Sequence, residues 1–300
     1  MIELQPDKGI PRRLLFMMAA MAGLTVANLY YNQPLLELMR ADIGMGEVEA
    51  NMVTVVTQAG YALGLCLIIP LGDLWSRRRI IVTCMVGAAL MTAAIAIATE
   101  AWVLWAASLV MGACSVVPQL FMPMAGQYSR PADKARNIGC VLSGLLCGIL
   151  ASRVVSGMVG QWLGWRTMFA VASVAMVASL AVILAMMPAM KPNFSGSWAQ
   201  LMASVGRMVA GSGRIRVCSV RAALGFGSML SVWSCMAFRL AAEPFCAGAD
   251  AVGALGLCGV AGAMVAGGMG RLVGRFGVRR FSVAGAVVLM GAWAVAWGFD

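Results

Sequence analysis

The sequence has little charge and no histidine. Only 11% of its 300 residues are Asp, Glu, Lys or Arg, whereas 61% are hydrophobic. A soluble domain usually carries about 25% charged residues, because water must wet its surface. The low charge density therefore argues against a soluble protein and favours a chain that lipid surrounds.

Several chemical signatures are also missing. The nine cysteines form no C-x-x-C pair, and without histidine the usual zinc-binding patterns cannot occur. The chain has no G-x-x-x-x-G-K-[ST] phosphate loop, no catalytic triad and no pair of carboxylates suited to catalysis. We therefore expect no cofactor and no metal site, and we do not expect an enzyme. The net charge of +10 lies in short clusters between apolar runs, which does not fit a nucleic-acid-binding face.

Long apolar runs fill most of the chain. A helix needs about 20 apolar residues to cross the hydrocarbon core of a membrane. The first run is too long for a signal peptide and more runs follow it, so we expect it to be retained. The runs predict nine membrane-spanning helices, at about 14–35, 51–71, 80–98, 101–125, 137–160, 166–188, 215–238, 251–270 and 280–299.

The basic residues indicate an orientation for these spans. If the N-terminus is cytoplasmic, 18 of the 22 lysines and arginines fall in cytoplasmic segments. Only Arg40, Arg166 and Arg239 fall outside, and Arg153 lies within a span. Because cytoplasmic loops concentrate Lys and Arg, this pattern predicts a multi-pass protein of the cell (inner) membrane with a cytoplasmic N-terminus.

The longest segment between spans contains an apolar stripe. In SWAQLMASVGRMVA (197–210), apolar side chains recur at helical spacing beside polar ones. This pattern predicts an amphipathic helix that lies on the cytoplasmic membrane surface. The alternative is a flexible linker with a chance pattern.

A repeat divides the chain into two parts. DLWSRRRI (73–80) and GRFGVRRF (274–281) align at an offset of 201 residues, which also places the first span over the seventh. The segments LGDLWSRRR and GRLVGRFGVRR resemble the two copies of the hairpin motif G-x-x-x-D-R-x-G-R-R of the major facilitator superfamily (MFS). NLYYNQPLL (28–36) and GLLCGILASRVVSG (144–157) resemble a subgroup of bacterial efflux permeases within it, which we name by its YNQPLL first-helix motif.

The resemblance implies an all-α polytopic membrane protein with the MFS fold. We expect an N-terminal six-helix half at 1–188, a cytoplasmic linker with the amphipathic helix at 189–213, and a partial C-terminal half of about three helices at 214–300. A complete second half would extend to about residue 389 at the same offset. We therefore expect either a truncated form or fragment, or an unusual nine-span protein.

The hairpins are expected to control conformation. In the family, the acidic residue of the hairpin helps to latch the two halves together, and the resemblance assigns this role to Asp73. Asp73 could pair with an arginine or face a helix N-terminus; the alternative is a purely topological turn. The second copy has Gly274 at the position where the family motif has its acidic residue. The candidate latch residues are Gly72, Asp73, Arg77, Arg78, Arg79, Gly270, Arg275, Gly277, Arg279 and Arg280.

Arg153 is the strongest candidate for contact with a solute. An arginine at the centre of a membrane helix costs about 2.5–3.5 kcal/mol on insertion scales, so it normally faces a cavity or a partner. The alternative is a structural arginine that is bonded to backbone carbonyls or lies near the outer interface. Tyr30 and Gln33 are polar neighbours in the first span, where span-end tyrosines are commonly interface anchors. The further candidates for the cavity are Gln119, Asn28, Tyr31, Asn32, Gln58 and Tyr61.

These observations predict a secondary transporter that moves a small organic solute, most simply outward. Its partners would be the solute, the lipid bilayer and, as one candidate, a coupling proton, although the span interiors offer no obvious proton-carrying acid. Nucleic acid is not an expected partner. The alternative function is a transport-inactive truncated membrane protein or an assembly partner.

Overall fold

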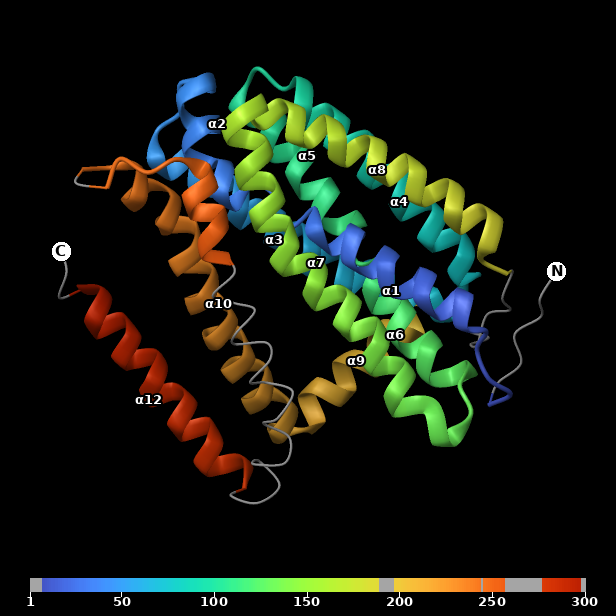
Figure 1. Ribbon diagram of the computed structural model, residues 1–300. Coiled ribbons are helices and arrows are strands. Elements are labelled where there is room, and N and C mark those ends of the chain that lie inside the picture. Colours follow the sequence, from blue (N-terminus) through green and yellow to red (C-terminus); the bar gives the residue numbers. More distant parts are fainter. Residues whose placement is uncertain (1–6, 189–196, 244, 257–276, 298–300) are drawn as a thin grey trace.

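The computed structural model describes residues 7–188, 197–243, 245–256 and 277–297. In these residues the chain forms helices and connecting turns, with no strand. The polypeptide runs back and forth through long helices that lie side by side (Figure 1). The all-α fold class expected from the apolar runs is therefore confirmed.

The described helices overlap the predicted spans, and most of the eighth predicted span (251–270) lies outside the described residues. In order they are α1 (Arg12–Ala27), η1 (Gln33–Leu35), α2 (Leu36–Ile43), α3 (Glu47–Leu74), α4 (Arg77–Ile97), α5 (Ala101–Cys114), α6 (Val117–Tyr128), η2 (Pro131–Asp133), α7 (Lys134–Leu163), α8 (Trp165–Met186), α9 (Trp198–Gly211), α10 (Gly213–Ala241), a helix over 249–256, and α12 (Val278–Trp297). Within the described residues, six segments are long and apolar enough to cross a membrane: Glu47–Leu74, Arg77–Ile97, Ala101–Tyr128, Pro131–Leu163, Trp165–Met186 and Gly213–Ala241.

The first predicted span is not one regular helix. α1 ends at Ala27, a series of turns follows, and the chain continues through η1 into α2. Pro34 has no backbone N–H and its ring crowds the carbonyl of Tyr30, so a regular helix cannot pass this point. The short helix α2 was not predicted from the sequence.

The fourth predicted span is broken in the middle. α5 ends at Cys114 and α6 begins at Val117. Pro118 sits in the first turn of α6 and cannot donate a hydrogen bond to the carbonyl of Cys114, four residues earlier. The Ser115 hydroxyl donates to the carbonyl of Met111 at 2.8 Å and helps to satisfy the backbone at the break.

Small residues set which helices lie in contact. α1 packs along α7, α3 along α5, and α4 along α8. A Cβ added to Gly23 would lie 2.6 Å from the Gly144 carbonyl oxygen, and one added to Gly148 would collide with Gly23 itself. Gly60 meets the backbone of Leu109 in the same way. The pairs Gly60/Gly64 and Gly144/Gly148 therefore act in close helix packing, as their spacing indicates.

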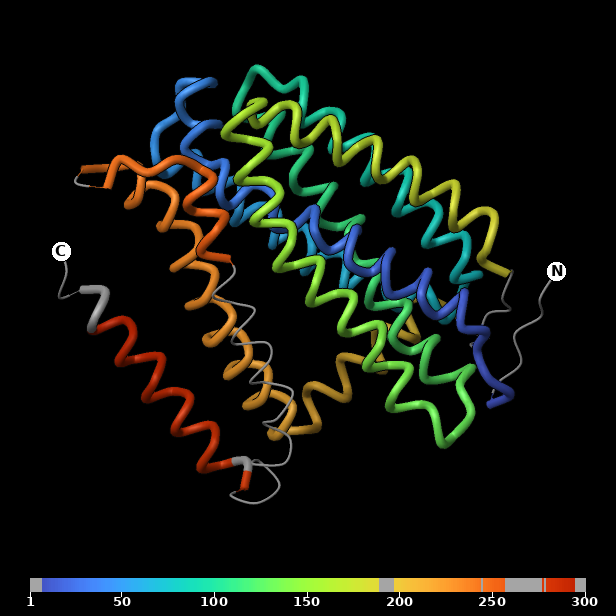
Figure 2. Tube along the Cα trace, viewed as in Figure 1, coloured from blue at the N-terminus to red at the C-terminus, as the bar shows by residue number. Residues whose placement is uncertain are grey.

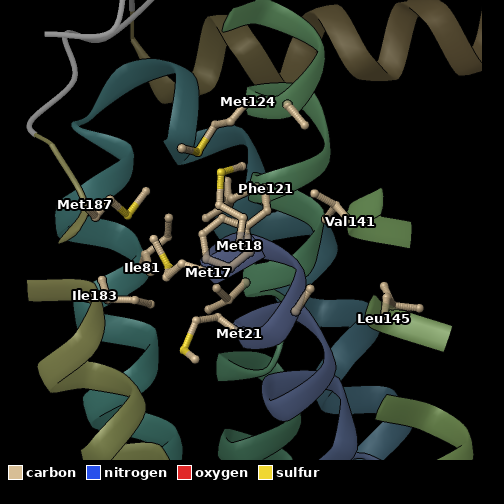
Figure 3. Close-up of a cluster of buried hydrophobic side chains, with 14 of the residues drawn as sticks. Met17, Met18, Met21, Ile81, Phe121, Met124, Val141, Leu145, Ile183 and Met187 are labelled. Carbon is tan, nitrogen blue, oxygen red and sulfur yellow. The ribbon is translucent and has the colours of Figure 1, made fainter. Parts of the chain in front are cut away.

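Two apolar clusters form the interior of this helix bundle. One contains Met18, Ile81 and Phe121, which are fully buried, together with other methionines of α1 and α6 (Figure 3). The other gathers side chains of α2, α5 and α8 around Met39 and Phe169. Methionine is flexible and fills irregular gaps, which explains its frequency here.

The predicted linker helix is present. α9 begins after Ser197, whose hydroxyl accepts from the Gln200 N–H at 3.3 Å, while the Gln200 side chain accepts from the Ser197 N–H at 3.0 Å. This reciprocal capping box defines the start of the helix. No residue of α9 is buried, and the helix contacts α3 and α10.

The helices after α9 run beside those before it and meet them at one end. α10 contacts η1, α2 and α3. Near the same end, Gly157 of α7 lies against the backbone of Ala249 and Gly253, and the Gln161 side chain accepts from the Ala249 N–H at 3.0 Å. We call this end of the helix bundle the α2 end. We call the opposite end, where α4 and α10 begin, the basic end. Towards the basic end, α10 diverges from the bundle, and α12 lies on the far side of α10 from it (Figures 1 and 2).

Candidate functional site

Arg153 of α7 lies at the contact between the two parts of the chain. Only 3% of its surface is exposed. Its Nε donates to Gln33 Oε1 at 2.9 Å. Its guanidinium lies over the ring of Tyr30 at 4.8 Å and over the ring of Trp233 of α10 at 4.4 Å. Such cation–π contacts favour the buried charge, since each ring face is electron-rich.

The Arg153 group is not fully satisfied. Among the described residues, Arg153 Nη2 and Gln33 Nε2 are buried and have no hydrogen-bond partner. Both atoms are donors, and no carboxylate is paired with this arginine in the described part of the chain. Buried donors normally find acceptors, because an unmatched buried polar group is costly. Arg153 Nη2 and Gln33 Nε2 could therefore donate hydrogen bonds to an oxygen of a bound ligand.

Other predicted cavity residues make polar contacts nearby. Asn32 Nδ2 donates to Thr57 Oγ1 at 3.2 Å, which joins the first span to α3. Gln119 Nε2 donates to the Tyr61 hydroxyl at 3.0 Å, which joins α6 to α3. Gln58 is half-buried, and its Nε2 has no partner among the described residues.

Two predicted residues point elsewhere. Asn28 Nδ2 contacts Met176 Sδ of α8 at 3.3 Å. Tyr31 is buried beside a groove of about 590 Å³ between α1, α7 and α8, which is lined mainly by alanine, glycine and valine. The structure thus brings Asn32, Gln58, Tyr61 and Gln119 to the α3 side, and places Asn28 and Tyr31 towards α8.

Trp233 was not predicted as a site residue. It is an aromatic residue inside an apolar run, so its type carries no signal of its own. The repeat could have indicated it, because the 201-residue offset aligns Trp233 with Asn32, which is next to Gln33. Tyr30, which the sequence favoured as an interface anchor, is buried and stacks with Arg153.

The first hairpin is a compact polar cluster at the basic end. Arg77 is buried; its Nη1 donates to Gln127 Oε1 at 2.8 Å and its Nη2 lies 3.3 Å from Asp73 Oδ1. A Cβ at Gly72 would lie 2.8 Å from Leu120 Cδ2, so the Leu120 side chain would have to shift to admit it. Asp73 thus pairs with an arginine of its own hairpin. Arg78 Nη2 donates to the Leu184 carbonyl at 2.9 Å, and Arg79 is exposed.

The second hairpin is only partly described. Gly277 adopts a φ of +83°, which favours glycine, and α12 follows directly. Arg279 and Arg280 are exposed at the start of α12. Gly270 and Arg275 lie outside the described residues.

The fold and the buried polar contacts define a polytopic helical membrane protein with a polar site between its helices. A model of the Major Facilitator Superfamily matches residues 15–299. The chain therefore belongs to this superfamily, and the resemblance seen in the hairpins is confirmed at that level.

Two relatives are named as transporters. The "Uncharacterized transporter YgaY" of Escherichia coli O157:H7 is 34% identical over 243 residues, which are 80% of this chain and 61% of the relative. The "Probable transporter SCO4007" of Streptomyces coelicolor is 35% identical over 295 residues, which are 97% of this chain and 66% of the relative. The chain thus spans about two thirds or less of the length of these two relatives.

Solved structures show the same fold. A bacterial homologue of the human lysosomal transporter Spinster, in an inward-facing and unoccupied conformation, matches 89% of this chain and 63% of its own chain with a TM-score of 0.69 and 16% identity. A mutant of the nucleoside transporter NupG matches 89% of this chain and 69% of its own with a TM-score of 0.67 and 12% identity.

Proposed function

We propose that this protein is a secondary transporter that moves a small organic solute across the bacterial cell membrane, in the outward direction. The N-terminus and the basic end lie in the cytoplasm, where anionic headgroups attract the arginine clusters. The names of the relatives support transport. The resemblance of residues 28–36 and 144–157 to efflux permeases supports the direction.

One observation carries the proposal. Arg153 keeps a buried donor without an acceptor among the described residues, although the surrounding helices are closely packed. A guanidinium in a membrane span is expensive, and such residues commonly mark a solute pathway. The two aromatic rings and Gln33 offset part of the cost and hold the group in place. The remaining donor edge suits an anionic or polar oxygen of the solute.

The contact between Arg153 and Trp233 couples solute binding to conformation. Arg153 belongs to the helices before the linker and Trp233 to the helices after it. In carriers of this type, the two parts rock against each other around a site near the midplane. Movement of α10 changes the position of Trp233 over the guanidinium, so the site has a different affinity in each state. We propose that the Asp73–Arg77 hairpin stabilises one of these states.

Reconstituted vesicles test the proposal. The full chain is placed in vesicles and offered a panel of small organic anions and neutral solutes, with and without an imposed proton gradient. We expect flux above empty vesicles for at least one anion. Arg153→Gln should lower the apparent affinity roughly 10- to 150-fold, since a hydrogen bond to a charged group contributes about 1.5–3 kcal/mol. Failure of every solute to cross faster than in empty vesicles would refute transport.

A matched variant separates binding from folding. Arg221→Gln removes one positive charge at an exposed position of α10 and should leave flux unchanged. Size-exclusion profiles and melting temperatures of both variants are compared with those of the parent protein. If Arg153→Gln folds like the parent and transports equally well, Arg153 does not contact the solute.

A further inference from the structure

A groove of about 670 Å³ lies at the basic end, away from the Arg153 site. It lies between the start of α1, the start of α4 and the end of α8. Its lining combines three arginines with an apolar wall: Pro11, Arg12, Arg13, Leu14, Arg78, Leu184, Ala185, Met186, Met187 and Pro188. Among the described residues, no acidic side chain lines the groove.

In the part of the chain that the structure describes, no carboxylate forms an ion pair with the three arginines of the groove. Arg12 and Arg13 are exposed in the first turn of α1, and Arg78 lies in the first turn of α4. Helix N-termini already carry partial positive charge, so arginines there are placed against the helix dipole. Asp73, the acidic residue of the adjoining hairpin, is paired with Arg77. An anion bound between the two helix starts would relieve this repulsion.

Arg78 is held at the edge of the groove by the backbone. Its Nη2 donates to the Leu184 carbonyl at 2.9 Å, near the end of α8, where carbonyls lack helical partners. Its Nε is buried and has no hydrogen-bond partner among the described residues. The guanidinium is thus positioned, but its donors are only partly used.

The other wall of the groove is suited to hydrocarbon. Leu184 is 48% exposed and Met186 is 40% exposed, and both lie in the last turn of α8, which is mainly apolar along its length. In a membrane-spanning bundle this places an apolar surface on the lipid side, with the arginines at the level of the headgroups. A soluble phosphate would use only the arginines, whereas an amphiphile would use both walls.

We propose that this groove binds an anionic glycerophospholipid of the membrane leaflet at the basic end. The phosphate oxygens accept hydrogen bonds from Arg12, Arg13 and Arg78, and one acyl chain lies along Leu184 and Met186. Arginine suits this role because its planar donors match phosphate geometry. The lipid would tie α1, α4 and α8 together beside the first hairpin.

Native mass spectrometry of the full chain tests the site. The protein is released from detergent after addition of phosphatidylglycerol, phosphatidylcholine or glycerol 3-phosphate. We expect tight binding of phosphatidylglycerol alone. The variant Arg12→Gln/Arg13→Gln should weaken it about 30-fold, because each basic side chain near an anionic lipid surface strengthens binding about fivefold. The control Arg214→Gln/Arg216→Gln removes the same charge from exposed positions outside the groove and should have a much smaller effect.

Four outcomes would overturn the proposal. An equal loss in both double variants would mean diffuse attraction to the surface, and equal binding of phosphatidylcholine would remove the role of charge. Equal binding of glycerol 3-phosphate would show an anion site rather than a lipid site. If the double variant misfolds, Met186→Glu gives the answer, because it places a negative charge on the apolar wall and leaves all three arginines in place. Undiminished phosphatidylglycerol binding by that variant would refute the site.

Discussion

Two arginines are buried in the described part of the chain, and their surroundings differ. Arg77 sits at the basic end, where Asp73 and Gln127 satisfy its guanidinium. Arg153 sits within a span, where Gln33 and two aromatic rings leave one donor unused. A satisfied arginine supports structure, whereas an unsatisfied one is available to a ligand. At the scale of single residues, polar partners distinguish a structural arginine from a candidate site.

The contacts of the first hairpin predict which substitutions there destabilise the protein most. Arg77→Gln should destabilise the protein by about 1–3 kcal/mol, because it removes the buried donor that joins α4 to Gln127. Asp73→Asn should cost about 1 kcal/mol or less, since the Asp73 side chain is 47% exposed and such pairs contribute little. Arg79→Gln, at an exposed position, serves as the control. Melting temperatures in detergent provide the measurement, and a larger effect of Asp73→Asn than of Arg77→Gln would contradict this assignment.

At the scale of elements, close backbone contact decides which helices pair. α1 and α7 meet through Gly23, Gly144 and Gly148, with no space for a Cβ at the contact. Lipid is as apolar as the helix surfaces, so association depends on such packing rather than on the removal of water. Glycine positions in the sequence therefore indicate contact faces but not the partner helix.

Two glycines of α7 provide a matched test of this packing. Gly148→Ala should destabilise the protein by about 1–3 kcal/mol, because the added Cβ would collide with the backbone of Gly23. Gly139→Ala, on the same helix, meets no atom within 4 Å and should be neutral or stabilising by up to about 1 kcal/mol. Thermal melting of the two variants in the same detergent makes the comparison. Equal melting temperatures would show that α1 and α7 do not pack through Gly148.

At the scale of the whole molecule, the arginines at the start of α4 and those at the start of α12 lie at the same end. α4 begins with Arg77–Arg79, and α12 begins beside the first half of α10, where Arg221 and Arg279 line one groove. α4 and α12, which begin with these arginines, thus run in the same direction. Contacts between them gather at the α2 end, around Arg153, Gly157 and Gly253. This arrangement is compatible with rocking about that end.

Cysteine labelling tests the orientation. In a variant with all native cysteines replaced, single cysteines are introduced as Arg79→Cys, Arg279→Cys and Glu47→Cys, all at exposed positions. A thiol reagent that cannot cross the membrane should label only Glu47→Cys on intact cells, because the proposed orientation places the α2 end outside. After the membrane is permeabilised, all three should react. Labelling of one arginine-rich turn but not the other on intact cells would disprove the parallel arrangement.

Much of this fold could be predicted from the sequence, and the site only in part. Apolar runs, arginine clusters and the 201-residue repeat identified the membrane helices, the linker helix α9 and the family. They also singled out Arg153, since a charge within an apolar run is visible without a structure. They did not predict α2 or the break before Pro118. A proline can interrupt a helix while the span keeps enough apolar residues to cross the membrane.

The local composition determined which segments are apolar enough to lie in lipid and which are polar enough to lie in water. This by itself specified the spans and the class of protein. Only the tertiary structure decided how each helix is rotated about its axis. That rotation turns Asn28 towards Met176 and brings Gln33, Tyr30 and Trp233 around a guanidinium that is distant from them in the chain. The physical reason is that a polar contact within the membrane depends on the packing of several helices at once, which the pattern along one helix does not record.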